Sequence, residues 1–179
     1  MTCIAAVAQK GKVWMCSDSA ATTEDGTLFT FSNPKLFKFG RLIIGVAGHD
    51  RIWNVLLYRT DWPDPPKSGF DRWSNIELLQ AIKTALTKEL GIDNTDKYLE
   101  ESEVLIGVAG RLYQIEGTLS VARPRENYSA VGSGSALALG ALYATQKSRL
   151  GPRERLRRAL EAAACYRSDV APPWHWEEV

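Results

Sequence analysis

The chain has 179 residues, enough for one domain with a sizeable core and short for two. Its 22 basic and 21 acidic side chains give a net charge of +1, so the charge balance does not favour a nucleic acid or an anionic membrane surface as partner. Lys10 and Lys12 interrupt the apolar opening run, and no segment approaches the length of a membrane span. We therefore expect a cytoplasmic protein without a signal peptide.

The three cysteines, Cys3, Cys16 and Cys165, lie far apart and lack the spacing of metal ligands. Cys3 and Cys16 fall on two strands that are expected to pair, so a disulfide is geometrically conceivable. Reduced cysteines, as in cytosolic proteins, are the preferred interpretation.

The opening of the chain has the pattern of a β-hairpin. Residues 3–9 and 12–18 are apolar, β-branched or aromatic runs joined by a Gly-containing turn. Because the first run is apolar at nearly every position, it predicts a strand that is covered on both faces.

A second hairpin is predicted over residues 35–39 and 42–48, after a short apolar run at 28–31. Gly45 and Gly48 interrupt or end its second strand, which indicates a bulge or a close backbone approach.

The remaining elements alternate between helical and strand patterns. They are a helix over 49–60, an irregular loop over 61–73, a helix over 74–90 ended by Gly91, a hairpin over 103–109 and 111–116, a strand at 128–131, helices over 136–148 and 152–167, and a short edge strand at 174–179. Both sets of strands are apolar enough to be covered on two faces. We therefore predict an α+β fold with a single domain over residues 1–179, in which two antiparallel sheets stack and helices cover them, a four-layer αββα sandwich.

Thr2 is the first candidate for chemistry. Only Met1 precedes it, and a methionine in front of a small residue is normally removed. Removal would leave a threonine whose own amine, with a pKa of about 8, can take the proton of the weakly nucleophilic hydroxyl. If Met1 stayed attached, the amine would be an amide and could not act as a base. Thr after the initiator Met is common in unrelated proteins, so the prediction depends on the rest of the sequence.

Six short motifs occur in a recognisable order. They are Thr2-Cys3-Ile4, Ser17-Asp18, Lys35-Leu36-Phe37, Gly45-Val46-Ala47-Gly48, Gly132-Ser133-Gly134-Ser135 and Asp169. Together they resemble proteasome β subunits and their bacterial relative HslV, which are N-terminal nucleophile hydrolases with the αββα fold. The resemblance covers essentially the whole chain and implies a threonine-type endopeptidase subunit of a self-compartmentalised ring protease.

The resemblance also implies catalytic roles. Thr2 matches the nucleophile, and Lys35 matches the lysine beside its hydroxyl, where an ammonium lowers the hydroxyl pKa and stabilises a developing alkoxide. Asp18 matches the carboxylate that holds this lysine.

Gly45 matches the glycine whose N–H faces the substrate oxyanion. Ser133 and Asp169 match the residues that orient the threonine amine. The wall next to Gly45 is expected to include Ala21, Ile43 and Ala47, which would favour an apolar side chain before the cleaved bond.

Two departures from the family pattern stand out. Cys3 occupies a position where relatives often carry a second threonine, and Pro172-Pro173 follows Asp169 where proteasome subunits carry a serine and glycines. The segment 162–168 resembles the HslV stretch whose backbone carbonyls bind a monovalent cation, and this implies a possible site at three carbonyls, those of Ala162, Cys165 and Ser168. The chemistry itself needs no metal or organic cofactor.

The implied partners are a peptide or unfolded protein as substrate, further copies of the chain in a double ring of six or seven subunits per ring, and an ATPase unfoldase. The Trp residues and the segment 52–57 are expected to form ring contacts. Two alternatives stay open: a small-molecule amidase of the same fold, for which no large pocket-lining insertion is visible, and a catalytically silent ring or scaffold subunit.

Overall fold

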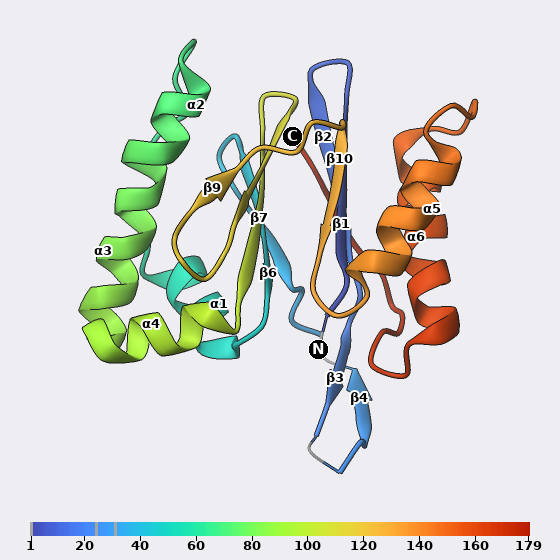
Figure 1. Ribbon diagram of the computed structural model, residues 1–179, viewed down its shortest axis with the longest axis horizontal. Coiled ribbons are helices and arrows are strands. Elements are labelled where there is room, and N and C mark those ends of the chain that lie inside the picture. Colours follow the sequence, from blue (N-terminus) through green and yellow to red (C-terminus); the bar gives the residue numbers. More distant parts are fainter. Residues whose placement is uncertain (1, 24, 31) are drawn as a thin grey trace.

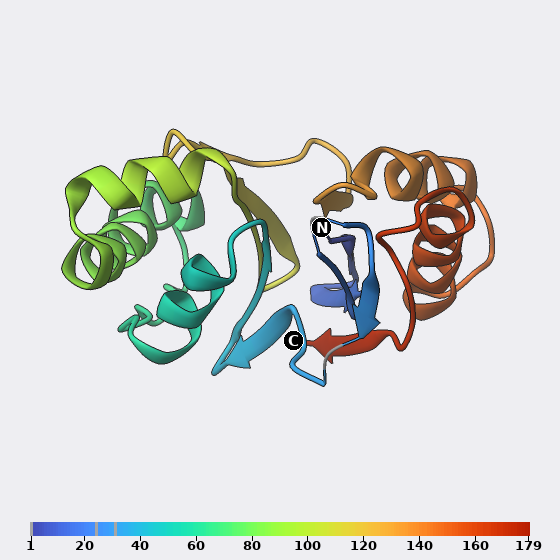
Figure 2. The same ribbon diagram turned by 90° about the horizontal axis from the view of Figure 1, so that it is seen from below.

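The computed structural model describes residues 2–23, 25–30 and 32–179, without the side chains of residues 92–94 and 96. Two antiparallel sheets stack face to face between two layers of helices (Figures 1 and 2). This confirms the predicted αββα sandwich.

The first sheet has the strand order β10-β1-β2-β11. Its strands are β1 (Ile4–Gln9), β2 (Lys12–Ser17), β10 (Tyr128–Val131) and β11 (His175–Glu178). Ile4 pairs with Ser17 on one side and with Val131 on the other, so the first strand after Thr2 lies inside the sheet. The last strand pairs with β2 at the edge, as predicted for residues 174–179.

The second sheet has the order β5-β6-β7-β8-β9. It consists of β5 (Leu36–Phe39), β6 (Leu42–Ala47), β7 (Glu103–Val108), β8 (Arg111–Ile115) and β9 (Val121–Ala122). A separate two-stranded sheet, β3 (Ala20–Thr22) and β4 (Leu28–Thr30), extends beyond the sandwich at the bottom of Figure 1.

Helices cover the outer face of each sheet (Figure 2). The first sheet is covered by α5 (Ser135–Thr145) and α6 (Pro152–Tyr166). The second is covered by a group made of α1 (Asp50–Tyr58), α2 (Phe70–Trp73), a π-helical segment η1 (Ser74–Leu78), α3 (Leu79–Leu90) and α4 (Ile92–Glu100). In the part of the chain described here, no helix is both long and apolar enough to cross a membrane.

Three apolar layers hold the sandwich together. The middle layer, between the sheets, contains Ile4, Met15 and Ile43, and two outer layers join each sheet to its helices. Every residue of β1 except the last is buried, which explains why its sequence is apolar throughout rather than alternating.

Two expectations about the helical layer are wrong. The loop predicted over 61–73 ends in a helical turn, α2, and a further helix, α4, follows Gly91.

Ile52 and Leu56 have no exposed surface in the chain because they pack in the core under α1. They therefore cannot form the ring contacts expected of them.

Candidate active site

Thr2 lies two residues before the start of β1 and is only 4% exposed. Its carbonyl accepts the N–H of Gly134 and the hydroxyl of Ser133, each at 3.2 Å, and its own nitrogen donates to Ser133 Oγ at 3.2 Å. Gly132, with φ +89°, comes so close that a Cβ there would lie 2.3 Å from the Thr2 carbonyl oxygen. The loop that holds Thr2 thus requires a glycine at this position. Met1, whose removal we predict, lies outside the described residues.

Asp18 and Lys35 form an ion pair beside Thr2. The fully buried Asp18 carboxylate accepts three hydrogen bonds, from the N–H of Cys3 at 2.9 Å, the N–H of Ala20 at 3.0 Å and the Lys35 ammonium at 2.9 Å. Lys35 Nζ also donates to the Ala20 carbonyl at 2.5 Å. A buried carboxylate is stable only with such partners, so it fixes where the ammonium lies.

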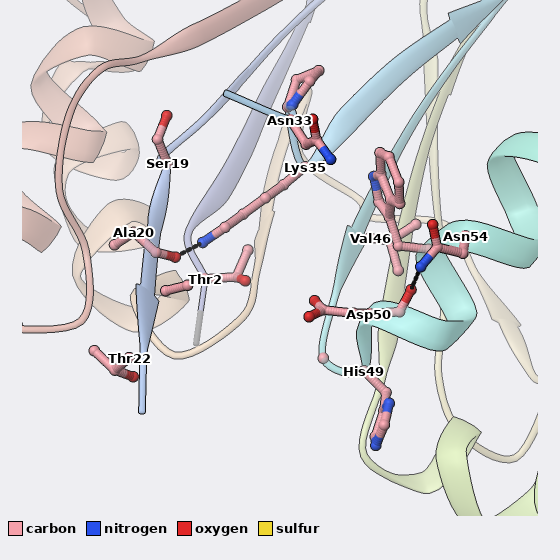
Figure 3. Close-up of a pocket in the computed structure, with 14 residues that line it drawn as sticks. Thr2, Ser19, Ala20, Thr22, Asn33, Lys35, Val46, His49, Asp50 and Asn54 are labelled. Carbon is pink, nitrogen blue, oxygen red and sulfur yellow. Dashed lines mark hydrogen bonds between the residues drawn. The ribbon is translucent and has the colours of Figure 1, made fainter. Parts of the chain in front are cut away.

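One cavity of about 490 Å³ opens at this point between the two sheets. Its lining residues are Thr2, Ser19, Ala20, Ala21, Thr22, Asn33, Pro34, Lys35, Val46, Gly48, His49, Asp50, Trp53 and Asn54. In Figure 3 the Lys35 side chain reaches across the cavity wall toward Thr2 and Ala20. Thr2 and Lys35 therefore lie on the same side of the structure, as the expected chemistry requires.

Asp169 lies on the other side of Ser133. It is 4% exposed, and both of its oxygens accept hydrogen bonds from Arg167, at 2.8 Å from Nε and 2.6 Å from Nη2. The Arg167 hydrogen bonds lower the pKa of Asp169 despite its burial, and the Ser133 hydroxyl, whose single proton is shared between Asp169 and the Thr2 carbonyl, adds to this effect. A polar chain thus runs from Arg167 through Asp169 and Ser133 to the nitrogen of Thr2. Arg167 was not predicted from the sequence as the partner of Asp169. The available signal was its position two residues before Asp169.

Cys3, next to Thr2, is not a competing nucleophile. Burial, and secondarily the charge of Asp18, raises the pKa of the Cys3 thiol to about 12. Its side chain packs under α5 and α6 in the apolar layer together with Cys16, and both cysteines are free. At neutral pH the thiol stays protonated and unreactive.

The Pro172-Pro173 segment, which departs from the family pattern, contacts the site through backbone atoms. The Ser19 hydroxyl donates to the Pro173 carbonyl, and the Ser19 N–H donates to the Ala171 carbonyl at 3.0 Å. Because Ser19 lines the cavity, this stretch supports the cavity wall although it lacks the family's serine.

Gly45 lies elsewhere than expected. It is paired within the second sheet, and a Cβ there would lie 2.9 Å from Ile4 Cγ2 and 3.0 Å from Met15 Sδ, in the layer between the sheets. Two other residues of this motif, Val46 and Gly48, line the cavity. Gly48 has φ +117°, and a Cβ there would lie 2.3 Å from the Glu101 carbonyl oxygen. Only glycine fits this turn.

The prediction of the residues that form the cavity wall is only partly correct. Ala21 lines the cavity, whereas Ile43 and Ala47 pack in the layer between the sheets. The sequence is apolar at these two positions because they belong to the core, and this does not indicate a substrate pocket.

The wall opposite Thr2 comes from the start of α1. Asp50, Trp53 and Asn54 line it together with His49, whose ring lies 4.3 Å from that of Tyr98. The spacing of positions 50, 53 and 54 places them on one face of a helix, so this signal was present in the sequence but pointed only to a helix.

The proposed carbonyl site for a monovalent cation stays a prediction. Ala162 and Cys165 belong to the end of α6, and Ser168 follows it. The carbonyl of Cys165 is one of the last four of the helix, which have no partner within the helix, and this fits a cation ligand. Ala162 lies one residue too early for that, so its carbonyl fits less well. No group of His, Cys, Asp or Glu side chains that could hold a metal occurs among the residues described.

No family model matches the sequence. Two curated relatives do. The ATP-dependent protease subunit HslV of Chlorobium luteolum is 31% identical over 172 residues, which cover 91% of this chain and 86% of the relative. The ATP-dependent protease subunit HslV of Caldicellulosiruptor saccharolyticus is 29% identical over 168 residues, which cover 91% and 89%.

Solved structures share the fold at lower identity. HslV from Trypanosoma brucei superimposes with a TM-score of 0.77 at 19% identity, and BPH from Thiobacillus denitrificans in complex with epoxomicin with 0.76 at 19%; each match covers 99% of this chain and 98% of the other. Anbu from Yersinia bercovieri gives 0.72 at 12%, covering 99% and 81%. With the fold matched throughout and sequence identity above 30% to one HslV over nearly its full length, the chain belongs to the HslV family.

Proposed function

We propose that this chain is the threonine peptidase subunit of a ring protease and that residues 1–179 act as one catalytic domain. One observation carries the proposal: Thr2 and the Lys35 ammonium line the same cavity, while Asp18 holds Lys35 and Ser133 holds the Thr2 nitrogen. Nucleophile, base and electrostatic stabiliser are thus close together once Met1 is removed.

The arrangement supports an acyl-enzyme mechanism. The Thr2 hydroxyl attacks the scissile carbonyl while its proton passes to the Thr2 amine, directly or through a water molecule. The C–N bond then breaks, the departing amine takes that proton, and an ester to Thr2 remains. The Thr2 amine next removes a proton from water, which attacks the ester and releases the acid, and that proton returns to the Thr2 oxygen to restore the hydroxyl. Lys35 stabilises the charge on the threonine oxygen.

The oxyanion donor that we propose is in the turn at Gly48 rather than at Gly45. Gly48 lines the cavity with Thr2, and its left-handed backbone brings the main chain to the cavity surface without a side chain. Gly45 is enclosed by Ile4 and Met15, which supports a packing role.

The substrate that we propose is an unfolded peptide chain with a polar or basic side chain in the cavity. Asp50, Asn33 and Asn54 line it, whereas two of the three expected apolar wall residues do not. This replaces the apolar preference expected from the sequence.

The curated relatives are named as subunits of an ATP-dependent protease, and we propose the same partnership here. The proposal includes a double ring of six or seven copies per ring and an ATPase that delivers unfolded substrate. It also includes a cytoplasmic location, which the free state of all three cysteines supports.

Exact mass measurement of the purified chain tests the proposal directly. We expect a mass without Met1, a single adduct with a threonine-directed electrophile, and cleavage of fluorogenic peptides. Thr2→Ala should assemble normally but lose both adduct and cleavage, and Thr2→Ser should retain part of each. Cleavage that survives in Thr2→Ala would refute the proposal. A processed chain that hydrolyses small amides but no peptide would favour the amidase alternative.

A further inference from the structure

Glu103 extends from the second sheet to the loop that holds Thr2. It is the first residue of β7 and is half-buried. Its Oε2 accepts the N–H of Gly132 at 2.7 Å. Gly132 follows β10 of the first sheet, so the bond links the two sheets at their active-site end.

The second oxygen of Glu103 belongs to a polar network. Gln114 Nε2 donates to Glu103 Oε1 at 3.5 Å, and Gln114 Oε1 accepts the Ser129 hydroxyl at 3.3 Å. Within the described part of the chain, no lysine or arginine forms an ion pair with Glu103. Its carboxylate is therefore committed to neutral donors, of which the backbone N–H of Gly132 is the closest.

The residues directly before Glu103 contact the turn at Gly48, the second glycine turn of the site. Ser102 Oγ accepts the N–H of His49 at 3.1 Å and donates to the Tyr98 carbonyl at 2.8 Å. Gly48 packs against the backbone of Glu101 and Ser102. Residues 101–103 thus touch both the turn at Gly48 and the loop at Gly132.

We propose that Glu103 is a positioning residue for Thr2, a role that rests on the proposed peptidase function. Its carboxylate fixes the peptide plane of Gly132, and this places the Ser133 hydroxyl and the Gly134 N–H, both of which hydrogen-bond Thr2. Glu103 itself does not touch substrate. It acts through the loop, by keeping the amine and hydroxyl of Thr2 in the reactive geometry.

This role predicts a specific kinetic effect. Loss of the Glu103 acceptor leaves the Gly132 N–H without its partner and frees the loop, and a displacement of about 1 Å at a reacting group can lower a rate about 100-fold. Glu103 does not line the cavity, so substrate binding should persist. We therefore expect kcat to fall and KM to change little.

Two substitutions separate the effect of the hydrogen-bond acceptor of Glu103 from the effect of its negative charge. Glu103→Ala removes both and should lower kcat at least tenfold. Glu103→Gln keeps an oxygen for the Gly132 N–H, and its new NH₂ group can be accommodated because the Gln114 amide can rotate to present its own oxygen while Ser129 accepts. Glu103→Gln should therefore retain at least a third of the wild-type kcat.

A matched control removes a carboxylate that also accepts a hydrogen bond but lies in the helical layer. Asp71 in α2 accepts the Tyr113 hydroxyl at 2.8 Å and pairs with the exposed Arg123. Asp71→Ala should change kcat less than twofold. Urea unfolding and the molar mass of the assembly are measured for every variant, so that a general loss of structure is recognised.

The experiment uses the processed full-length protein in the assembly that it forms. Peptide cleavage gives kcat and KM, and the rate of adduct formation by a threonine-directed electrophile reports the geometry of Thr2 without a peptide. A tenfold slower adduct rate in Glu103→Ala, with partial recovery in Glu103→Gln, supports the proposal. An assembled Glu103→Ala variant with wild-type kcat and adduct rate overturns it, as does Glu103→Gln as inactive as Glu103→Ala. If the wild type cleaves peptides and Thr2→Ala does not, the proposed peptidase function holds whichever result the Glu103 variants give.

Discussion

At the scale of single residues, Lys35 is needed for both stability and chemistry. Its ammonium is the only side-chain cation bonded to the fully buried Asp18 in the described structure. Lys35→Met should abolish cleavage and lower the free energy of unfolding by about 3 kcal/mol, because it leaves a buried carboxylate without its counterion. Peptide cleavage and urea unfolding measure the two effects.

Lys38 provides the control for this substitution. It lies three residues later and donates to the Glu178 carbonyl on the exposed surface. Lys38→Met should change the free energy of unfolding by less than about 1 kcal/mol and leave cleavage intact. Equal losses in both variants would show that the Asp18 pair has no special importance.

Asp169 should make stability depend on pH at the acidic end. Its pKa in the folded protein is held below the ordinary value of 3.8, mainly by Arg167. A group with a lowered folded pKa stabilises the fold fully above its unfolded pKa, and this contribution is lost as the pH falls through the folded value. The difference in free energy of unfolding between the wild type and Asp169→Asn should thus be constant from pH 7 to about 5 and shrink below 3.8. Urea unfolding at several pH values checks this, and a gap that widens on acidification would contradict it.

At the scale of elements, α1 supplies the charged wall of the cavity. Asp50 faces the space beside Thr2, so it should favour a basic side chain there (Figure 3). An ion pair that stays partly solvated contributes up to about 1 kcal/mol, or about fivefold in rate. Asp50→Asn should lower kcat/KM for peptides with arginine before the cleaved bond about fivefold and leave those with leucine nearly unchanged.

Asp61 is the matched control for the cavity charge. It is exposed, lies beyond the end of α1 and does not line the cavity. Asp61→Asn should leave the ratio of the two peptide rates as in the wild type. A preference for arginine that persists in Asp50→Asn would place the recognition of basic side chains elsewhere.

The hairpins could be predicted because their sequences combine local turn signals with a strand pattern. β1 and β2 joined through Gly11 and β5 and β6 joined through Gly40 are examples, and their buried runs led to the layered fold. The helix α4 could not be predicted because Gly91, which ends α3, reads as a stop signal, whereas the structure resumes a helix at the next residue. Local signals mark where an element ends but not what the tertiary structure starts next.

The residues of the candidate site likewise divide into those that the sequence could locate and those that it could not. Thr2, Asp18, Lys35, Ser133 and Asp169 could be located because each carries a side chain of distinctive chemistry within a motif. Gly45 and Gly48 are two glycines three residues apart, and the sequence contains no signal that tells core packing from the cavity surface. The difference arises only from the layer between the sheets, where Ile4 and Met15 occupy the space beside Gly45.

At the scale of the whole molecule, the sandwich leaves the outer part of one element exposed, although Ala20 at its base is buried and bonded to Asp18 and Lys35. The β3–β4 hairpin extends beyond both sheets (Figure 1), and its Leu28 and Phe29 are 45% and 48% exposed. An isolated two-stranded hairpin is only marginally stable in water, so it needs a packing surface. In a ring, a second copy of this chain would provide that surface.

The double substitution Leu28→Ser/Phe29→Ser should therefore reduce the assembly to smaller species while the circular dichroism of the chain stays unchanged. Cleavage should fall as well, because Phe29 pairs with Ala21, which lines the cavity. Light scattering after size-exclusion chromatography measures the assembly. Ile76→Ser is the control, since Ile76 is 50% exposed but lies on the outer helical layer. A double variant that assembles like the wild type would mean that the hairpin is not a subunit contact, and the position of Thr22 and Ala21 in the cavity wall would then depend on the single chain alone.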